Sequence, residues 1–250
     1  MNSKVSYGQL YTKVREALQS LNLTSEEISH VQAEGLERLI PKVIQLISSE
    51  TTGSLLDVGC GDGTTAYCLK RILNLEVTGI DCDSIFLKRA ENKGIKTVSL
   101  NLETDIFPFP DETFSHVTFI EVIEHLAKPE HCLSEIARVL KPEGELILTT
   151  PNLVGLGNRI SILSGKDPIS GELHIRPYER HIRLYARNSL ESLLANWFRV
   201  IKLDWCRPYR PQGRYSWKVL GRDILCTFKK DLSGQILVKC QRLNLYPNKD

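Results

Sequence analysis

The sequence predicts an α/β fold, in which a mostly parallel sheet carries helices on both faces and is preceded by N-terminal helices. Between residues 54 and 150, short apolar runs alternate with amphipathic segments of helical period. Repeated β-α units of this length imply parallel strands joined by right-handed crossovers. In addition, the first apolar run leads directly into Gly59, Gly61 and Gly63, which is typical of a strand-to-helix turn that holds a nucleotide-like ligand.

The expected elements follow in a regular order. Apolar runs predict strands at residues 54–58, 76–81, 95–100, 115–120 and 145–150. The segments between them predict helices at residues 64–73, 84–93 and 129–140. The alternation stops at Pro151, so the chain beyond this residue is expected to serve a different purpose from the sheet core.

Both ends of the chain carry additions to this pattern. We expect residues 1–50 to form a helical extension that covers the ligand as a lid, with helices at 5–21 and 25–47 and a kink or break at Pro41. Residues 51–250 are expected to form the ligand-binding domain, in which 151–187 is a substrate-side loop insertion with one helix. A further helix at 188–197, capped by Asn188, is expected to precede the C-terminal strands within 198–245, which are expected at 198–205 and near Leu225 and Val238.

The composition excludes several classes of protein. The seven cysteines are odd in number and form no C-x-x-C pair, which argues against a disulfide framework and against a cysteine-rich zinc site. We therefore expect a reducing, cytoplasmic environment. No run of about 20 apolar residues is present, so no transmembrane segment is expected.

The net charge of +2 conceals a basic C-terminal part. Residues 176–250 hold 16 Lys and Arg against 6 Asp and Glu, which indicates either an anionic partner or a solvated basic face. Basic and aromatic residues also alternate there, at Trp205, Arg207, Tyr209, Arg210, Arg214, Tyr215, Trp217 and Lys218. This mixture can stack on RNA bases, meet an anionic membrane surface, or simply be solvated.

The charges around the glycines limit the class of ligand that the loop can bind. Asp57 and Asp62 would repel a pyrophosphate but attract a sulfonium that also carries an α-amino group. Asp81 ends the second expected strand, where a carboxylate can accept hydrogen bonds from both hydroxyls of a ribose. A glycine triad alone can be a tight turn, but its combination with these acids favours a cationic nucleoside.

Residues 55–63 and 77–81 resemble the first two cofactor motifs of class I S-adenosylmethionine-dependent methyltransferases, and the resemblance continues through 108–114, 121–126 and 140–145. It implies a Rossmann-like fold with a seven-stranded sheet and S-adenosyl-L-methionine as cofactor. In that family the loop glycines bind the methionine portion and the acid after the second strand binds the ribose. Related sequences often carry Asp where this chain has Asn101, before Leu102. Asn can still accept a bond from the adenine amino group, with Asp105 as the alternative.

Glu121, Glu124 and His125 follow the fourth expected strand, near the place where the methyl group should lie. In a helix their spacing would put all three on one side. They could then ligate Mg²⁺, Mn²⁺ or Zn²⁺, with His181 or His174 completing the shell. Alternatively, the segment only begins a helix and Glu121 faces substrate without a metal. The catalytic candidates are Glu121, His125 and His181, with either histidine as general base.

The same cluster resembles two metal-using families. These are the ubiquinone-pathway O-methyltransferases and the 2′-O-methyltransferases of small RNAs, in which a second histidine joins the site; residues 150–152 and 180–185 resemble that layout. Many small-molecule enzymes of the superfamily share both stretches. The expected function is O-methylation of a small-molecule, lipid-linked or sugar acceptor by in-line transfer. The alternatives are metal-assisted RNA 2′-O-methylation, an inactive cofactor-binding partner subunit, and a decarboxylase or synthase on the same fold.

Overall fold

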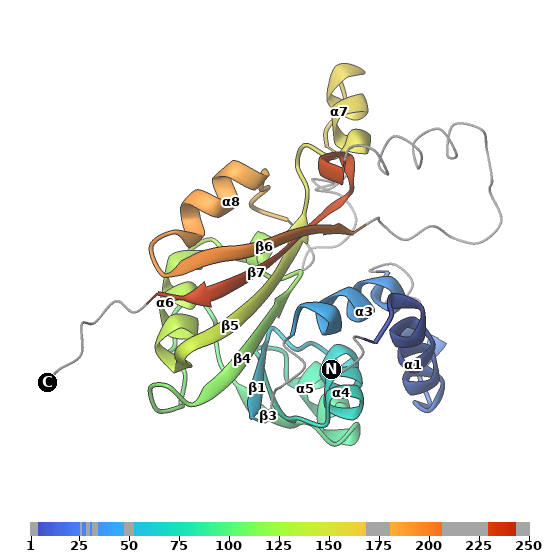
Figure 1. The fold of residues 1–250 in the computed structure, drawn as a ribbon, viewed down its shortest axis with the longest axis vertical. Helices are drawn as coiled ribbons and strands as arrows, with labels where there is room; N and C mark the ends of the chain where they lie inside the picture. The colour runs from blue at the N-terminus through green and yellow to red at the C-terminus, as the bar shows by residue number, and fades with distance from the viewer. Residues whose placement is uncertain are drawn as a thin grey trace, which may run out of the picture.

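A seven-stranded sheet forms the centre of the molecule, with the strand order β3-β2-β1-β4-β5-β7-β6 (Figure 1). The computed structural model describes residues 5–25, 27–28, 31, 35–47, 53–168, 181–206 and 230–243. The strands are β1 (Ser54–Val58), β2 (Glu76–Asp81), β3 (Lys96–Ser99), β4 (Phe114–Ile120), β5 (Leu140–Pro151), β6 (Phe198–Cys206) and β7 (Gln235–Arg242). Neighbouring strands from β3 to β5 are parallel, whereas β7 runs antiparallel to both β5 and β6. The predicted mostly parallel sheet is confirmed.

Helices lie on both sides of this sheet (Figure 1). The described helices are α1 (Tyr7–Gln19), α3 (Leu36–Leu46), α4 (Thr64–Leu73), α5 (Ser84–Asn92), α6 (Pro129–Val139), α7 (Leu156–Leu163) and α8 (Arg187–Leu194), with 3₁₀ turns η1 (Ile123–His125) and η3 (Lys230–Leu232). The strands and helices predicted between residues 54 and 150 are confirmed to within a few residues, except that β5 begins earlier. The strand expected near Leu225 lies outside the described residues.

Consecutive residues of one strand belong to two different hydrophobic layers, one on each face of the sheet. In β1, Leu56 packs in a cluster with α6 and α8, while Leu55 packs in a second cluster with α1, α3 and α4. Successive side chains of a strand point to opposite faces, so a sheet buried on both faces needs apolar residues at consecutive positions. Because α1 and α3 belong to the second cluster, the N-terminal helices share the core of the sheet.

Two predicted helix boundaries are wrong. The second N-terminal helix breaks at Gly35, whose φ of +65° is left-handed, and α3 then runs through the buried Pro41. Glycine takes this conformation without a Cβ penalty, which makes it the better terminator. Asn188 does not cap α8. The helix starts one residue earlier, and the Ser189 hydroxyl accepts the Ala186 N–H at 3.1 Å.

The carboxyl ends of the parallel strands meet at one edge of the sheet. There β1 leads into Gly59, β2 ends at Asp81, β4 leads into Glu121, and β5 leads into Asn152. An isolated parallel bridge between Asn152 and Tyr185 brings the segment that starts at residue 181 to the same edge. Ligands of open parallel sheets bind at this edge.

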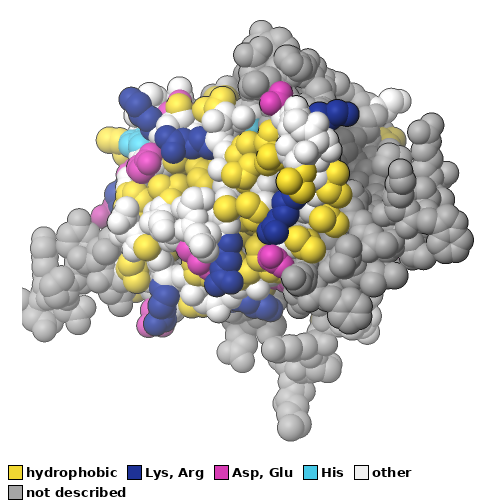
Figure 2. All heavy atoms as spheres, turned by 90° about the horizontal axis from the view of Figure 1, so that it is seen from above, with side chains coloured by type: hydrophobic (Ala, Val, Ile, Leu, Met, Phe, Trp, Pro, Cys, Tyr) yellow, Lys and Arg dark blue, Asp and Glu magenta, His cyan; other side chains and the backbone are white. Residues whose placement is uncertain are grey.

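Apolar side chains reach the surface on α7, which extends beyond the sheet (Figure 1). Ile160 and Ile162 are exposed, and Leu163 is 87% exposed. The exposed Arg159 and Lys166 lie on and just after the same helix. In the view of Figure 2, hydrophobic side chains form a broad group with single Lys and Arg side chains among them. Grouped apolar side chains are typical of a contact surface.

Candidate active site

Two of the three loop glycines are required by packing. Gly59, Gly61 and Gly63 all have left-handed backbones, with φ of +71°, +51° and +77°. A Cβ on Gly59 would lie 2.4 Å from Cγ2 of Val122, and one on Gly63 would lie 2.6 Å from Cβ of Ala90. Both the dihedral angles and the close neighbours therefore exclude a side chain at these positions.

Gly61 differs because its missing side chain faces open space. No heavy atom lies within 4 Å of a Cβ built on it, although its N–H donates to Oδ2 of Asp81 at 2.9 Å. The other oxygen of Asp81 accepts the Asp83 N–H at 3.0 Å. The loop backbone thus lies open beside an oriented carboxylate, which is the arrangement that a nucleoside needs.

Asp57 lies beneath the loop rather than on it. Its side chain is buried, and Oδ1 accepts a hydrogen bond from Oγ1 of Thr118 at 2.6 Å. Burial raises the pKa of Asp57 to about 7; the bond from Thr118 opposes this rise, and the charge of Asp81 adds to it. A nearby cation would favour the ionised form.

Asp62, in contrast, already has partners within the protein, which the sequence did not predict. Its carboxylate accepts the Thr64 N–H at 3.0 Å and the Thr64 hydroxyl at 2.9 Å. It also pairs with the ammonium of Lys93 at 3.2 Å. The negative charge near the open side of the loop therefore comes from Asp81 and from the buried Asp57.

We expect Asp57→Asn to flatten the dependence of stability on pH. A folded-state pKa of about 7 lies above the unfolded value of roughly 3.9, so between these values only the folded state binds the proton. Wild-type stability from this group is therefore full near pH 4 and declines as the pH rises to 7. Asparagine keeps an acceptor for Thr118 and does not titrate. Urea unfolding of both proteins at pH 5, 6, 7 and 8 measures the difference, and parallel curves would contradict it.

The expected adenine end is a tight turn after β3. Oδ1 of Asn101 accepts the Glu103 N–H at 2.9 Å, and Oδ2 of Asp105 accepts the Asn101 N–H at 2.8 Å. The Asn101 side chain is exposed, whereas Leu102 is buried in the core. Asn101 is thus presented to solvent by a turn that Leu102 anchors, and its contact with adenine stays a prediction.

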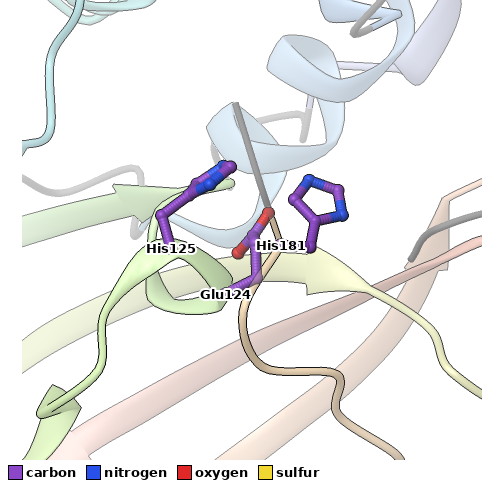
Figure 3. A group of neighbouring side chains, drawn as sticks. All are labelled: Glu124, His125 and His181. Atoms are coloured by element: carbon purple, nitrogen blue, oxygen red, sulfur yellow. The ribbon is translucent and has the colours of Figure 1, made fainter. Parts of the chain in front are cut away.

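Three of the predicted metal ligands come together at the ends of β4 and β5. One ligand atom from each of Glu124, His125 and His181 lies within 4.8 Å of the others. Figure 3 shows the Glu124 carboxylate between the two imidazoles. The two rings approach edge to face, with centroids 4.9 Å apart. Two nitrogen or oxygen ligands at about 2.1 Å from one ion are at most about 4.2 Å apart, so small movements would close this group around a cation.

Backbone hydrogen bonds hold this group in place. The carbonyl oxygen of Glu124 accepts the N–H groups of Ile182 and Arg183 at 2.9 and 3.0 Å. Oε2 of the buried Glu124 carboxylate accepts the Thr150 hydroxyl at 3.0 Å. These bonds bring His181 to the turn that carries His125. His174, the other histidine considered, lies outside the described residues.

Glu121 is placed differently from its two neighbours in the motif. Its φ is +55°, and its N–H donates to Oγ1 and O of Thr149 at 3.1 and 3.2 Å. Only Ile123–His125 form a short 3₁₀ turn, so the expectation of one helical side for all three residues is wrong. Glu121 is not part of the three-residue group. A left-handed glutamate is strained by roughly 1–2 kcal/mol and is held so by its surroundings.

The glycine loop, the acid after the second strand and the reversed β7 define a class I S-adenosylmethionine-dependent methyltransferase fold. Residues 56–148 match the family described as methyltransferase domain. These residues therefore form a methyltransferase domain of the class I superfamily.

Known proteins of this class cover different shares of the chain. It is 37% identical over 109 residues to the uncharacterised methyltransferase YodH of Bacillus subtilis, covering 42% of this chain and 46% of that protein. It is 34% identical over 155 residues to a ubiquinone biosynthesis O-methyltransferase of Xanthomonas oryzae pv. oryzae, covering 60% and 62%. The chain thus spans about half the length of the first of these curated relatives.

A solved structure agrees on the fold. An S-adenosylmethionine-dependent methyltransferase from Archaeoglobus fulgidus superimposes with a TM-score of 0.60 at 17% identity, covering 87% of this chain and 100% of that one. At this identity the likeness concerns the fold alone.

Other predictions concern surroundings and partners. No helix in the described part of the chain has both the length and the apolar character needed to span a bilayer. Among the cysteines within the described ranges, Cys60, Cys68, Cys82, Cys132 and Cys240 are free thiols. Trp205 is buried in the core beside β7, so it is not available to stack on a base. The remainder of the basic and aromatic run, Arg207 to Lys218, lies outside the described residues.

Proposed function

We propose that the chain is an S-adenosylmethionine-dependent methyltransferase that O-methylates a small-molecule or lipid-linked acceptor. The observation that carries this proposal is the open backbone at Gly61 beside the carboxylate of Asp81. The backbone of residues 59–63 would hold the methionine portion and Asp81 the ribose. Asn101 would hold the adenine from the turn that Leu102 anchors in the core, and the buried Asp57 would favour a cationic ligand. The cofactor supplies an electrophilic methyl group for in-line transfer.

The residues opposite the loop would prepare the acceptor. His125 or His181 can accept the proton of an acceptor hydroxyl, since a neutral imidazole nitrogen can act as a general base. The carboxylate and two imidazoles of Glu124, His125 and His181 also suit Mg²⁺, Mn²⁺ or Zn²⁺, and an ion held there would lower the pKa of that hydroxyl. Glu121, at the end of β4, would face the acceptor.

Two observations support an amphiphilic acceptor. One relative is a ubiquinone biosynthesis O-methyltransferase. In addition, α7 presents Ile160, Ile162 and Leu163 to solvent at the edge of the sheet that carries the site. An acceptor with an apolar chain could rest on this helix while its hydroxyl reaches His125.

Transfer of a tritiated methyl group from labelled cofactor into cell-extract fractions tests the proposal. The lipid or small-molecule pool should become labelled, and base treatment should leave an ether-linked methyl in place. Label in the RNA pool would instead identify RNA as the acceptor and contradict a small-molecule or lipid-linked one. Calorimetry that detects no binding of S-adenosylmethionine would contradict the proposal.

We expect Asp81→Ala to weaken binding of S-adenosylmethionine at least tenfold. The variant loses a charged acceptor for two ribose hydroxyls and the partner of the Gly61 N–H. Glu76→Ala is the matched control, because Glu76 starts the same strand at the opposite edge and is 76% exposed. Calorimetric titration of both variants measures the effect. Equal affinity for Asp81→Ala and wild type would place the ribose elsewhere.

A further inference from the structure

The largely buried ammonium of Lys93 contacts the cofactor loop, which consists of residues 59–63. Nζ of Lys93 donates to Oε1 of Glu27 at 2.8 Å, to the carbonyl oxygen of Asp62 at 2.8 Å, and to Oδ2 of Asp62 at 3.2 Å. The three side chains are only 8–9% exposed. Lys93 and Glu27 are not among the cofactor or acceptor residues described above, whereas Asp62 belongs to the loop itself.

The three residues come from separate parts of the chain. Glu27 belongs to the N-terminal segment, Asp62 lies between Gly61 and Gly63 in the loop, and Lys93 follows α5. Lys93 therefore holds the loop through both the carbonyl and the carboxylate of Asp62. Asp81 holds the same loop through the N–H of Gly61. The two contacts act on adjacent residues of one turn.

Glu27 is itself held firmly. Its Oε2 accepts the Thr24 N–H at 2.8 Å and the Thr24 hydroxyl at 2.9 Å. Burial alone would raise the pKa of Glu27, but the bonds from Lys93 and Thr24 prevail and lower it to about 2. Glu27 thus stays ionised at any working pH. Removing one member of such a buried set leaves the others with unpaired charge, which strains the set far more than the loss of a surface pair.

We propose that Lys93 is a positioning residue for the cofactor loop, and that through Lys93 the N-terminal segment at Glu27 sets the affinity for the cofactor without touching it. This inference rests on the proposed function, since it concerns the same loop. It gives the N-terminal extension a defined role. The segment stabilises the conformation of the loop through Lys93, and displacement of Glu27 lowers the affinity for the cofactor.

The test compares Lys93→Met and Glu27→Gln with Lys70→Met. Lys70 is the matched control, because its ammonium also donates to a backbone carbonyl, that of Gly94 at 2.8 Å, but on the surface. Calorimetry with S-adenosylmethionine should show at least tenfold weaker binding for Lys93→Met, roughly threefold to tenfold weaker binding for Glu27→Gln, and wild-type binding for Lys70→Met. Amide exchange of residues 59–63 in the cofactor-free protein should be faster in the first two variants only.

A double-mutant cycle separates positioning from general loss of stability. If Glu27 acts through Lys93, the double variant should bind the cofactor about as weakly as Lys93→Met alone, although each substitution also lowers the melting temperature. Additive losses, or affinities within twofold of wild type in the folded single variants, would overturn the inference. If Lys93→Met does not fold, Glu27→Gln alone decides, and wild-type cofactor affinity in this variant would overturn the inference. Wild-type protein that does not bind the cofactor would instead refute the proposed function.

Discussion

Replacing Glu121 with glycine is expected to stabilise the protein while lowering methyl transfer at least a hundredfold. Glu121 has a φ of +55°, a backbone conformation that disfavours every residue with a Cβ. Glycine would relieve a strain of about 1 kcal/mol, after allowing for the greater freedom that it gives to the unfolded chain. The same change removes the carboxylate that we place against the acceptor, and positioned acid–base groups contribute about 10²- to 10⁴-fold.

The chain offers a close control for this experiment. Glu143 is also a left-handed glutamate, with a φ of +59°, but it is exposed and lies at the start of β5, far along the strand from the site. Glu143→Gly should stabilise the protein to a similar extent and leave methyl transfer unchanged. Chemical unfolding and a single-turnover assay measure both effects. A Glu121→Gly enzyme with wild-type turnover would show that the Glu121 carboxylate has no part in the reaction.

Glu124→Gln is expected to abolish binding of a divalent cation and to reduce turnover by at least two orders of magnitude, while binding of S-adenosylmethionine stays within twofold of wild type. The amide oxygen can still accept the bond from the Thr150 hydroxyl, so the local structure should persist. What is lost is the anionic ligand between two imidazoles, which affects the cation strongly and the glycine loop little. His181→Ala should give the same separation of effects.

Metal analysis of the purified proteins and chelation of the wild type measure this effect. Treatment with a chelator should inactivate the wild type, and Mg²⁺, Mn²⁺ or Zn²⁺ should restore its turnover. Glu191→Gln is a suitable control, because it changes the same chemical group in a surface pair with Arg187 on α8. Wild-type turnover that resists chelation would exclude a metal, and the histidines would then remain as general bases alone.

Much of the fold could be predicted from local patterns. A strand buried on both faces requires consecutive apolar residues such as Leu55 and Leu56, and the left-handed loop requires glycine at Gly59 and Gly63; both demands are visible in the sequence. The error at Pro41 has a local cause too. Proline is a weaker terminator than a left-handed glycine when tertiary packing holds the helix, and Gly35 is such a glycine.

The parts of the site that could not be predicted depend on contacts between distant residues. His181 joins Glu124 through backbone bonds at Ile182 and Arg183, which carry no side-chain signature. The partner of Asp62 cannot be recognised from local sequence, because Lys93 is 31 positions away. The left-handed backbone of Glu121 has no signal at all, since glutamate rarely adopts it and only the surrounding structure enforces it.

The position of β7 has a consequence for synthesis of the protein. The strand lies between β5 and β6 in the sheet but follows both along the chain. While a ribosome is still translating the region before Gln235, the nascent chain therefore holds two strands without the neighbour that joins them. Unpaired strand edges recruit other chains. Chains truncated before Gln235 should accumulate as aggregates or be degraded, and emergence of β7 should coincide with the onset of protease resistance.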